Sequence, residues 1–227
     1  MLPVVDKLCI AFDLDGTLVD SAPDIHTIAN QVLIAVGGAP ITLAQARGFV
    51  GKGAGNFVAQ MRALRGIPET EQSRLLAMFL ERYEGAVSLS QLYPGVKEAL
   101  SVLERGGHHL ALCTNKPQVP TQAVLHHFDL QRFFSVVVGG DTLEVCKPDP
   151  AHLLAAFDRL DRSGKRIFVG DSEVDAETAH AAGVPFLLFT KGYRKTPIKD
   201  LPLSAVFDDH QTMPGLIQEI AGMGGAG

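Results

Sequence analysis

The chain has 227 residues, enough for one large domain or for a domain with a smaller one inserted in it. Hydrophobic residues make up 46% of the chain, so a sizeable core can form. Twenty basic residues against twenty-five acidic ones leave a formal charge of −5, which argues against nucleic acid as a partner. No apolar run reaches the roughly 18–20 residues that span a bilayer, so no membrane partner is expected.

The N-terminus and the cysteines predict a cytoplasmic protein. Residues 1–7 have neither the basic start nor the long apolar stretch of a signal peptide. Cys9, Cys113 and Cys146 lie far apart, without the paired spacing of a zinc site and in an odd number for disulfides. Reduced thiols in the cytoplasm are therefore expected.

Short apolar runs followed by helical patterns organise the chain. Helices are expected over residues 96–103, after Pro148-Asp149-Pro150 and over 173–182, and a frayed tail over 222–227. Continuous apolar strands that alternate with helices predict an α/β fold, a parallel sheet covered by helices on both faces. The predicted strands are residues 8–12, 110–113, 134–138, 167–169 and 184–189.

The connection between the first two strands breaks this pattern. It runs from about residue 20 to 108, far beyond a normal crossover. Its apolar residues recur at helical spacing over 24–36, 56–64 and 71–83, and Thr42 and Gln45 fit a capping box. The economical interpretation is a helical insert over about 20–88, followed by a helix that returns to the sheet.

Two carboxylates, Asp13 and Asp15, follow the first strand. Residues two apart in extended chain point the same way, and a like-charged pair is costly unless a cation neutralises it or one member is protonated. A turn with solvated aspartates is the alternative. An EF-hand loop is excluded because Leu18 stands where that loop needs glycine and no helix precedes it.

Further polar residues follow later strands, where ligands of open parallel sheets bind. Thr114 and Asn115 follow the second predicted strand, and Asp171 and Asp175 follow the fourth. Lys147 lies between them, just before a helix that begins with proline. Each signal alone is weak, and their order along one sheet is the informative feature.

In these residues the chain resembles the haloacid dehalogenase superfamily, in its phosphatase branch with a helical cap inserted after the first motif. The resemblance covers essentially the whole chain, and four motifs match in order: Asp13-x-Asp15-Gly16-Thr17, Thr114, Lys147 and Gly170-Asp171-x-x-x-Asp175. It implies a three-layer α/β/α, Rossmann-like core of residues 1–19 and 89–227, with a helical cap of residues 20–88.

The resemblance also implies roles. Asp13 is expected to be the nucleophile that forms an aspartyl-phosphate, and Asp15 the general acid and base. Mg²⁺ is expected on the carboxylates of Asp13 and Asp171 and the backbone carbonyl of Asp15, with Asp175 as a direct or water-mediated ligand.

Phosphate binding is expected from Thr114, Asn115 and Lys147, because a hydroxyl, nearby amides and an ammonium group can hold phosphoryl oxygens and neutralise their charge. Asp15 favours phosphate ester hydrolysis within the superfamily. Dehalogenases and phosphonoacetaldehyde hydrolases lack an aspartate there, and the latter use a cap lysine that Lys52 only superficially suggests.

The segment around Lys52 and Gly53 alternates glycines before a helix, which exposes amides that can bind an anion. A plain turn between helices is the alternative. The segment resembles the cap loop of phosphoglycolate phosphatases, so Lys52, Gly53 and Arg47 are expected to grip the substrate's non-reacting end.

The expected partner is therefore a small phosphorylated metabolite, foremost 2-phosphoglycolate, and the expected assembly is a monomer or homodimer. Another metabolite or sugar phosphatase, or a phosphosugar mutase of the β-phosphoglucomutase type, is the alternative. A signalling receiver is disfavoured because receivers have adjacent acidic residues and no long helical insert, and an inactive binding module because every motif position is intact.

Overall fold

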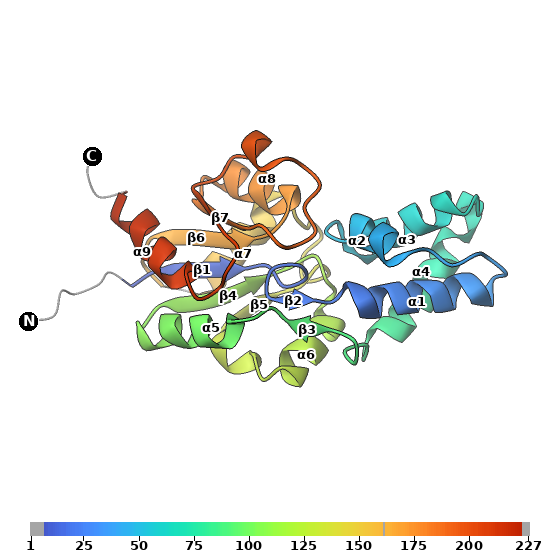
Figure 1. Cartoon of the computed structure of the whole chain (residues 1–227), viewed down its shortest axis with the longest axis horizontal. Coiled ribbons are helices and arrows are strands. Elements are labelled where there is room, and N and C mark those ends of the chain that lie inside the picture. The colour runs from blue at the N-terminus through green and yellow to red at the C-terminus, as the bar shows by residue number, and fades with distance from the viewer. Residues whose placement is uncertain (1–6, 161, 224–227) are drawn as a thin grey trace, which may run out of the picture.

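The computed structural model describes residues 7–160 and 162–223, and it shows an elongated molecule with a sheet-containing core at one end and a helical unit at the other (Figure 1). The six-stranded sheet has the order β5-β4-β1-β6-β7-β8, and every strand pair is parallel. This confirms the predicted α/β class. The strands are β1 (Cys9–Phe12), β4 (His109–Cys113), β5 (Val136–Val138), β6 (Arg166–Gly170), β7 (Phe186–Phe189) and β8 (Ala205–Phe207).

The central strand β1 shows why the strand sequences are continuously apolar. Ile10 and Phe12 pack into the core on one face of the sheet, while Cys9 and Ala11 pack into the core on the other. All four residues are buried, because successive side chains of a strand point to opposite faces and both faces are covered.

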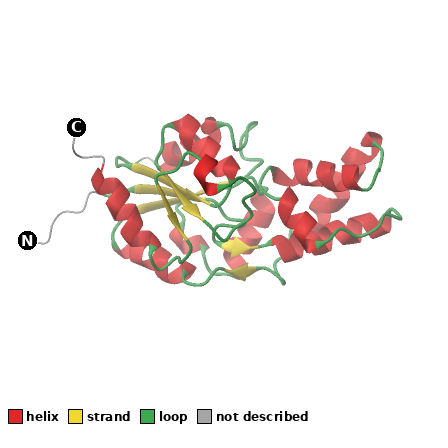
Figure 2. Cartoon of the chain, turned by 45° about the horizontal axis from the view of Figure 1, so that its top comes forward, coloured by secondary structure: helices red, strands yellow, loops and turns green. Residues whose placement is uncertain are grey.

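Helices cover both faces of the sheet, as Figure 2 shows. α5 (Val96–Arg105), α6 (Gln118–His127) and α9 (Met213–Met223) contribute to one core, and α7 (Pro150–Leu160) and α8 (Glu173–Ala182) to the other. The three-layer arrangement is therefore confirmed. The described residues also form three short 3₁₀ helices: η1 (Glu69–Glu71), η2 (Gln131–Phe133) and η3 (Ile198–Asp200).

The helical unit has a hydrophobic core of its own. Phe57, Phe79 and Tyr83 lie at its centre, with ring centroids 5.3 Å apart for Phe57 and Phe79 and 5.2 Å apart for Phe79 and Tyr83. The predicted capping box is present, because the Thr42 hydroxyl accepts from the Gln45 amide and the Gln45 side chain accepts from the Thr42 amide. The helices are α1 (Ala22–Ala35), α2 (Leu43–Phe49), α3 (Gly53–Leu64) and α4 (Gln72–Tyr83).

A short antiparallel ribbon of β2 (Val19–Asp20) and β3 (Gln91–Leu92) lies where the chain enters and leaves the helical unit. The predicted limits of that unit, residues 20 and 88, fall beside these two strands. Within the described residues, no helix is at once long and apolar enough to cross a membrane.

The sequence patterns do not reveal every element. β2, β3 and β8 have two or three residues each, too few for a recognisable alternation. α9 contains Gly215 and Gly222, which disfavour a helix, yet Met213 and Ile217 are fully buried against the sheet. The expected frayed tail is therefore wrong at residues 222–223, which are helical, and its residues 224–227 lie outside the described part.

Candidate active site

The carboxyl ends of three neighbouring strands form one edge of the sheet, and the helical unit faces this edge. Asp13 follows β1, Thr114 follows β4 and Asp171 follows β6, which are adjacent in the order β4-β1-β6. A cavity of about 40 Å³ lies between this edge and the helical unit. It is lined by Asp13, Asp15, Ile25, Val50, Gly51, Gly53, Ala54, Phe57, Phe79, Tyr83, Thr114, Asn115, Lys116 and Pro117.

Asp13 and Asp175 hold Lys147 between them. The Lys147 ammonium lies 2.9 Å from Asp13 Oδ1 and 2.6 Å from Asp175 Oδ1, and its side chain is 1% exposed. Burial alone would lower the pKa of Lys147, but these two carboxylates outweigh it and raise the pKa, so the lysine stays charged. Burial raises the pKa of Asp13 to about 7, against the opposing effect of Lys147.

Asp171 is fixed by two donors from distant segments. The Thr17 hydroxyl donates to its Oδ1 at 2.8 Å, and the Tyr193 amide donates to its Oδ2 at 2.6 Å. Gly16 passes so close that a Cβ there would lie 2.5 Å from Asp171 Oδ2, and its φ of +90° also favours glycine. Burial and the carboxylates of Asp175 and Asp13 raise the pKa of Asp171 well above its usual range.

The donor set fits a divalent cation. Carboxylate oxygens of Asp13, Asp171 and Asp175 lie within 4.8 Å of one another. The wider site sets four carboxylates against two ammonium groups (Asp13, Asp15, Asp171 and Asp175 against Lys116 and Lys147). A hard cation with oxygen ligands, such as Mg²⁺, would neutralise the remaining negative charge and lower the raised carboxylate pKa values.

Asp175 differs from the other two carboxylates because its own oxygens are already engaged. Oδ1 accepts from Lys147, and Oδ2 accepts from the Asp171 amide and from the amide and hydroxyl of Ser172. Asp175 also completes the capping box that begins α8 with Ser172. These contacts let Asp175 position Lys147. Its role as a direct or water-mediated metal ligand stays a prediction.

Asp15 points away from that cluster, toward the helical unit. The Ser21 hydroxyl donates to Asp15 Oδ1 at 2.6 Å, and the Lys116 ammonium lies 3.2 Å from the same oxygen. Lys116 also donates to the Tyr83 hydroxyl at 2.7 Å, and its nitrogen lies 4.2 Å from the centre of the Tyr83 ring. Burial, followed by Asp15 and Asp24, raises the pKa of Tyr83 well above its usual range, so the phenol is neutral.

Sequence reasoning missed Lys116 and Tyr83. Lys116 directly follows the Thr-Asn pair at the end of β4, and this adjacency was the available signal. Tyr83 looked like any apolar residue at the end of a helix, so nothing local distinguished it.

Thr114 and Asn115 lie at the cavity as predicted, but Asn115 has other partners. The Asn115 side chain donates to the carbonyls of Gly51 and Lys147 and accepts from the Lys147 amide. These contacts join the Gly51 loop of the helical unit to the Lys147 segment. The Asn115 side chain is thus engaged with Gly51 and Lys147, and phosphate binding by Asn115 stays a prediction.

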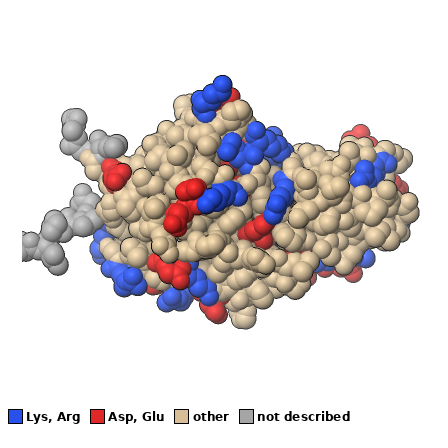
Figure 3. All heavy atoms as spheres, viewed as in Figure 1, with Lys and Arg blue, Asp and Glu red and all other residues tan. Residues whose placement is uncertain are grey.

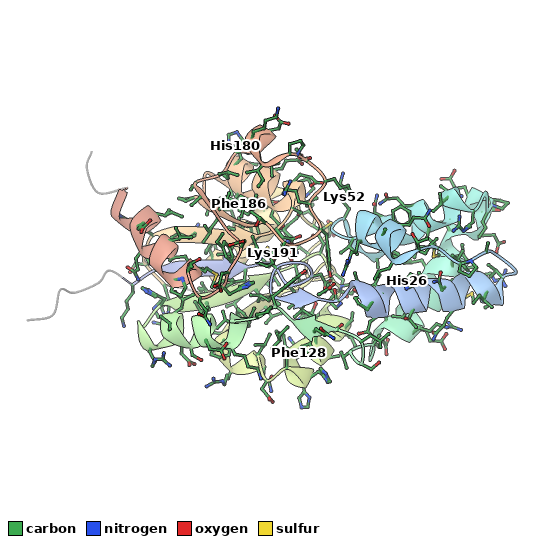
Figure 4. All side chains as sticks on the ribbon, viewed as in Figure 1. His26, Lys52, Phe128, His180, Phe186 and Lys191 are labelled. Atoms are coloured by element: carbon green, nitrogen blue, oxygen red, sulfur yellow. The ribbon has the colours of Figure 1, made fainter. Side chains whose placement is uncertain are left out.

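Of the three residues predicted to bind the substrate's non-reacting end, Lys52, Gly53 and Arg47, only Gly53 lines the cavity. Lys52 is exposed. Figure 4 places Lys52 where the helical unit meets the core. Arg47 pairs with Asp20 at 2.8 Å, and its side chain is 45% exposed. Figure 3 shows Lys and Arg side chains on the surface where the helical unit meets the core. Neither Lys52 nor Arg47 is among the residues that line the cavity.

This fold and this site correspond to a known family. The chain matches the haloacid dehalogenase-like hydrolases over residues 10–189, and it belongs to that family. The predicted resemblance is thereby confirmed.

The relatives of the chain within this family are phosphatases. The phosphoglycolate phosphatase of Cereibacter sphaeroides (strain ATCC 17029 / ATH 2.4.9) is 43% identical over 214 residues, which are 93% of this chain and 98% of the relative. That of Rhodobacter capsulatus is 44% identical over 211 residues, 92% of this chain and 96% of the relative. The crystal structure of a predicted phosphoglycolate phosphatase from Haemophilus somnus 129Pt has a TM-score of 0.86 at 30% identity, covering 96% of this chain and 100% of that chain. With the family match, these relatives make the chain a phosphoric monoester hydrolase.

Proposed function

We propose that this protein is a Mg²⁺-dependent phosphatase that converts 2-phosphoglycolate to glycolate and inorganic phosphate. The observation that carries the proposal is the small cavity with Asp13 and Asp15 at its core side and a wall of cap residues opposite. A nucleophile and a proton donor line the same cavity, as stepwise hydrolysis of a phosphate ester requires.

Asp13 acts as the nucleophile. Its carboxylate oxygen attacks phosphorus as the bond from phosphorus to the ester oxygen breaks, which leaves an aspartyl-phosphate on Asp13. Lys147, 2.9 Å from Asp13 Oδ1, reduces the repulsion between this carboxylate and the incoming anion. Thr114 and the backbone amide of Asn115 lie at the same cavity and hold phosphoryl oxygens.

Asp15 moves the protons. In its acid form it protonates the departing ester oxygen, and as the resulting carboxylate it takes a proton from the water that hydrolyses the aspartyl-phosphate. Lys116 and Ser21 hold this carboxylate in place at 3.2 Å and 2.6 Å. Both steps therefore use one group, which Lys116 and Ser21 hold at the cavity.

Mg²⁺ would be held by the carboxylates of Asp13 and Asp171 and the backbone carbonyl of Asp15, and when bound it neutralises charge on the phosphoryl group. Thr17 and Tyr193 orient Asp171 for this purpose through the two donors described above.

The size of the cavity supports a small substrate. Its volume of about 40 Å³ compares with the roughly 10–15 Å³ that one water molecule needs on the same measure, so it suits a small substrate better than a bulky sugar. Relatives over 40% identical across more than nine-tenths of the chain are phosphoglycolate phosphatases, which supports 2-phosphoglycolate in particular. A cytoplasmic location and a monomer or homodimer remain predictions.

The test is release of inorganic phosphate from 2-phosphoglycolate in the presence of Mg²⁺, with Asp13→Asn as the matched inactive variant. We expect kcat/KM at or above about 10⁴ M⁻¹s⁻¹ for the wild type. We expect a loss of at least ~10⁴-fold in the variant, because the neutral amide is not a nucleophile. Phosphate release that is equally fast in Asp13→Asn would contradict the mechanism, and transfer of phosphate back to a sugar would identify a mutase.

A further inference from the structure

One buried cation remains after the roles above are assigned. The Lys116 side chain is 1% exposed, and among the described residues that line the cavity it is the only basic one. Burying an ammonium group is costly unless charged or polar partners surround it. Lys116 holds Asp15 in place, but this contact alone does not require the ammonium group to face a cavity.

The position of Lys116 is rigid. Its backbone amide donates to the Thr114 hydroxyl at 3.2 Å, and its carbonyl accepts from the Gly140 amide at 2.8 Å and from the Thr121 hydroxyl at 3.2 Å. At its end, the ammonium group is held between Asp15 of the core and Tyr83 of the cap. A charge fixed in this way is pre-organised to bind an anion.

We propose that Lys116, assisted by the Tyr83 hydroxyl, binds the carboxylate at the non-reacting end of the substrate and thereby sets specificity for phosphate esters of small hydroxy acids. This inference rests on the proposed function and names the group that recognises the substrate.

The geometry favours this assignment because Asp15 is a neighbour both of Lys116 and of the ester oxygen that it protonates. Asp15 has to contact the ester oxygen in order to protonate it, and the Lys116 nitrogen lies 3.2 Å from Asp15 Oδ1. In 2-phosphoglycolate, a single methylene separates the ester oxygen from the carboxylate carbon. A substrate whose ester oxygen contacts Asp15 therefore brings its carboxylate within hydrogen-bond reach of Lys116.

The rest of the wall offers this carboxylate little else. Asp13 and Asp15 repel it, and the cap side of the wall is mostly apolar (Ile25, Val50, Ala54, Phe57 and Phe79). The neutral Tyr83 phenol accepts from Lys116 and retains its own proton, which it can donate to the carboxylate. An apolar wall also strengthens the contact between the ammonium group and an anion, because the local dielectric constant is low.

A pair of substrates isolates this role from the contact of Lys116 with Asp15. Ethyl phosphate carries a methyl group where 2-phosphoglycolate carries the carboxylate, and both esters need the same chemistry at phosphorus. Phosphate release from each ester is measured for the wild type, for Lys116→Met and for the control variant Lys97→Met. Lys97 lies in α5, and its side chain is 42% exposed. Thermal unfolding verifies that each variant is folded.

We expect the wild type to prefer 2-phosphoglycolate to ethyl phosphate by at least about 100-fold in kcat/KM, because the site hydrogen-bonds a group that ethyl phosphate lacks. Lys116→Met should lose most of this preference, with KM rising for 2-phosphoglycolate and not for ethyl phosphate. Any disturbance of Asp15 slows both substrates alike and leaves the ratio unchanged. Lys97→Met should match the wild type.

The outcomes separate the two proposals. A wild type that hydrolyses ethyl phosphate without preferring 2-phosphoglycolate would overturn the proposed substrate and, with it, the role of Lys116. A wild type that prefers 2-phosphoglycolate, together with a Lys116→Met variant that keeps the preference, would overturn the role of Lys116 alone.

Two further variants keep the test decisive if Lys116→Met does not fold. Lys116→Gln retains a polar side chain beside Asp15 and is judged by the same ratio. Tyr83→Phe preserves the ring under the ammonium group and removes only the hydroxyl, so it should lower the preference by a smaller factor, about tenfold. An unchanged ratio in both variants would also overturn the proposal.

Discussion

The core and the cap build the two sides of the cavity in different ways. On the core side, charged groups are buried and paired: Lys147 lies between Asp13 and Asp175, and Lys116 lies beside Asp15. On the cap side, the wall is mostly apolar and belongs to a separate hydrophobic core centred on Phe57 and Phe79. In the proposed mechanism, the reacting groups are therefore concentrated in the core, and the cap supplies a mostly apolar wall.

The difference has an energetic reason. A buried charge is tolerated only when its partners are fixed, so each core residue depends on several others and a single change disturbs the group. Apolar contacts are not directional, so the apolar part of the cap wall depends less on the exact placement of each side chain. The following predictions test this contrast, beginning with the largest expected effect.

Asp175→Asn should have the largest effect, although Asp175 is not expected to touch the substrate. The change removes a charge from the buried pair with Lys147 and should lower the free energy of unfolding by about 3 kcal/mol. It should also lower kcat by roughly 100-fold, because a displaced Lys147 no longer faces Asp13 correctly. Denaturant unfolding and phosphate release measure the two effects.

The loss of an exposed charge in the cap provides the contrast. Arg47→Met removes an exposed ion pair with Asp20 and should alter stability by less than about 1 kcal/mol. Should Asp175→Asn prove as mild as Arg47→Met, the view that the core charges form one interdependent group would be wrong.

The second prediction concerns pH and Mg²⁺. In the metal-free protein, burial raises the pKa of Asp13 to about 7, whereas an unfolded aspartate has a pKa near 3.9. Between these values the folded state binds a proton that the unfolded state has released, so this group makes the protein less stable as the pH rises from about 4 to about 7. We expect the free energy of unfolding of the wild type, relative to that of Asp13→Asn, to fall across this range in EDTA.

Excess Mg²⁺ should weaken or reverse that trend, because a bound cation favours the ionised carboxylate. His210 has a pKa lowered to about 4 by burial and works in the opposite direction, but it is present in both proteins and cancels in the difference. A difference that rises with pH in EDTA would show that Asp13 is already ionised without metal.

The smallest expected effects come from two matched capping boxes, one in each region. Thr42→Ala in the cap and Ser172→Ala in the core each remove a hydroxyl cap and should each cost about 1 kcal/mol of stability. Only Ser172→Ala should also lower kcat, because Ser172 donates to Asp175, which holds Lys147. Equal kcat values for the two variants would indicate that the hold on Lys147 does not depend on Ser172.

Local sequence was sufficient to predict most strands of the sheet, the edge at which the site lies and the start of one cap helix. The apolar runs revealed five of the six strands of the main sheet, because a strand buried on both faces needs apolar residues at every position. The spacing of Asp13, Thr114, Lys147 and Asp171 located the site, because parallel strands place their carboxyl ends at one edge. The Thr42 and Gln45 pair revealed a helix start for an equally local reason, since both hydrogen bonds lie within four residues.

Only the tertiary structure decided which side chains face the cavity. Lys116 meets Asp15 across 101 positions of sequence and Tyr83 across 33, while Lys52, the lysine that the glycine-rich loop had suggested, points outward. A sequence records which groups are available and their spacing along the chain. The direction of a long side chain depends on how distant segments pack around it, and at this site that packing selected Lys116 and left Lys52 in solvent.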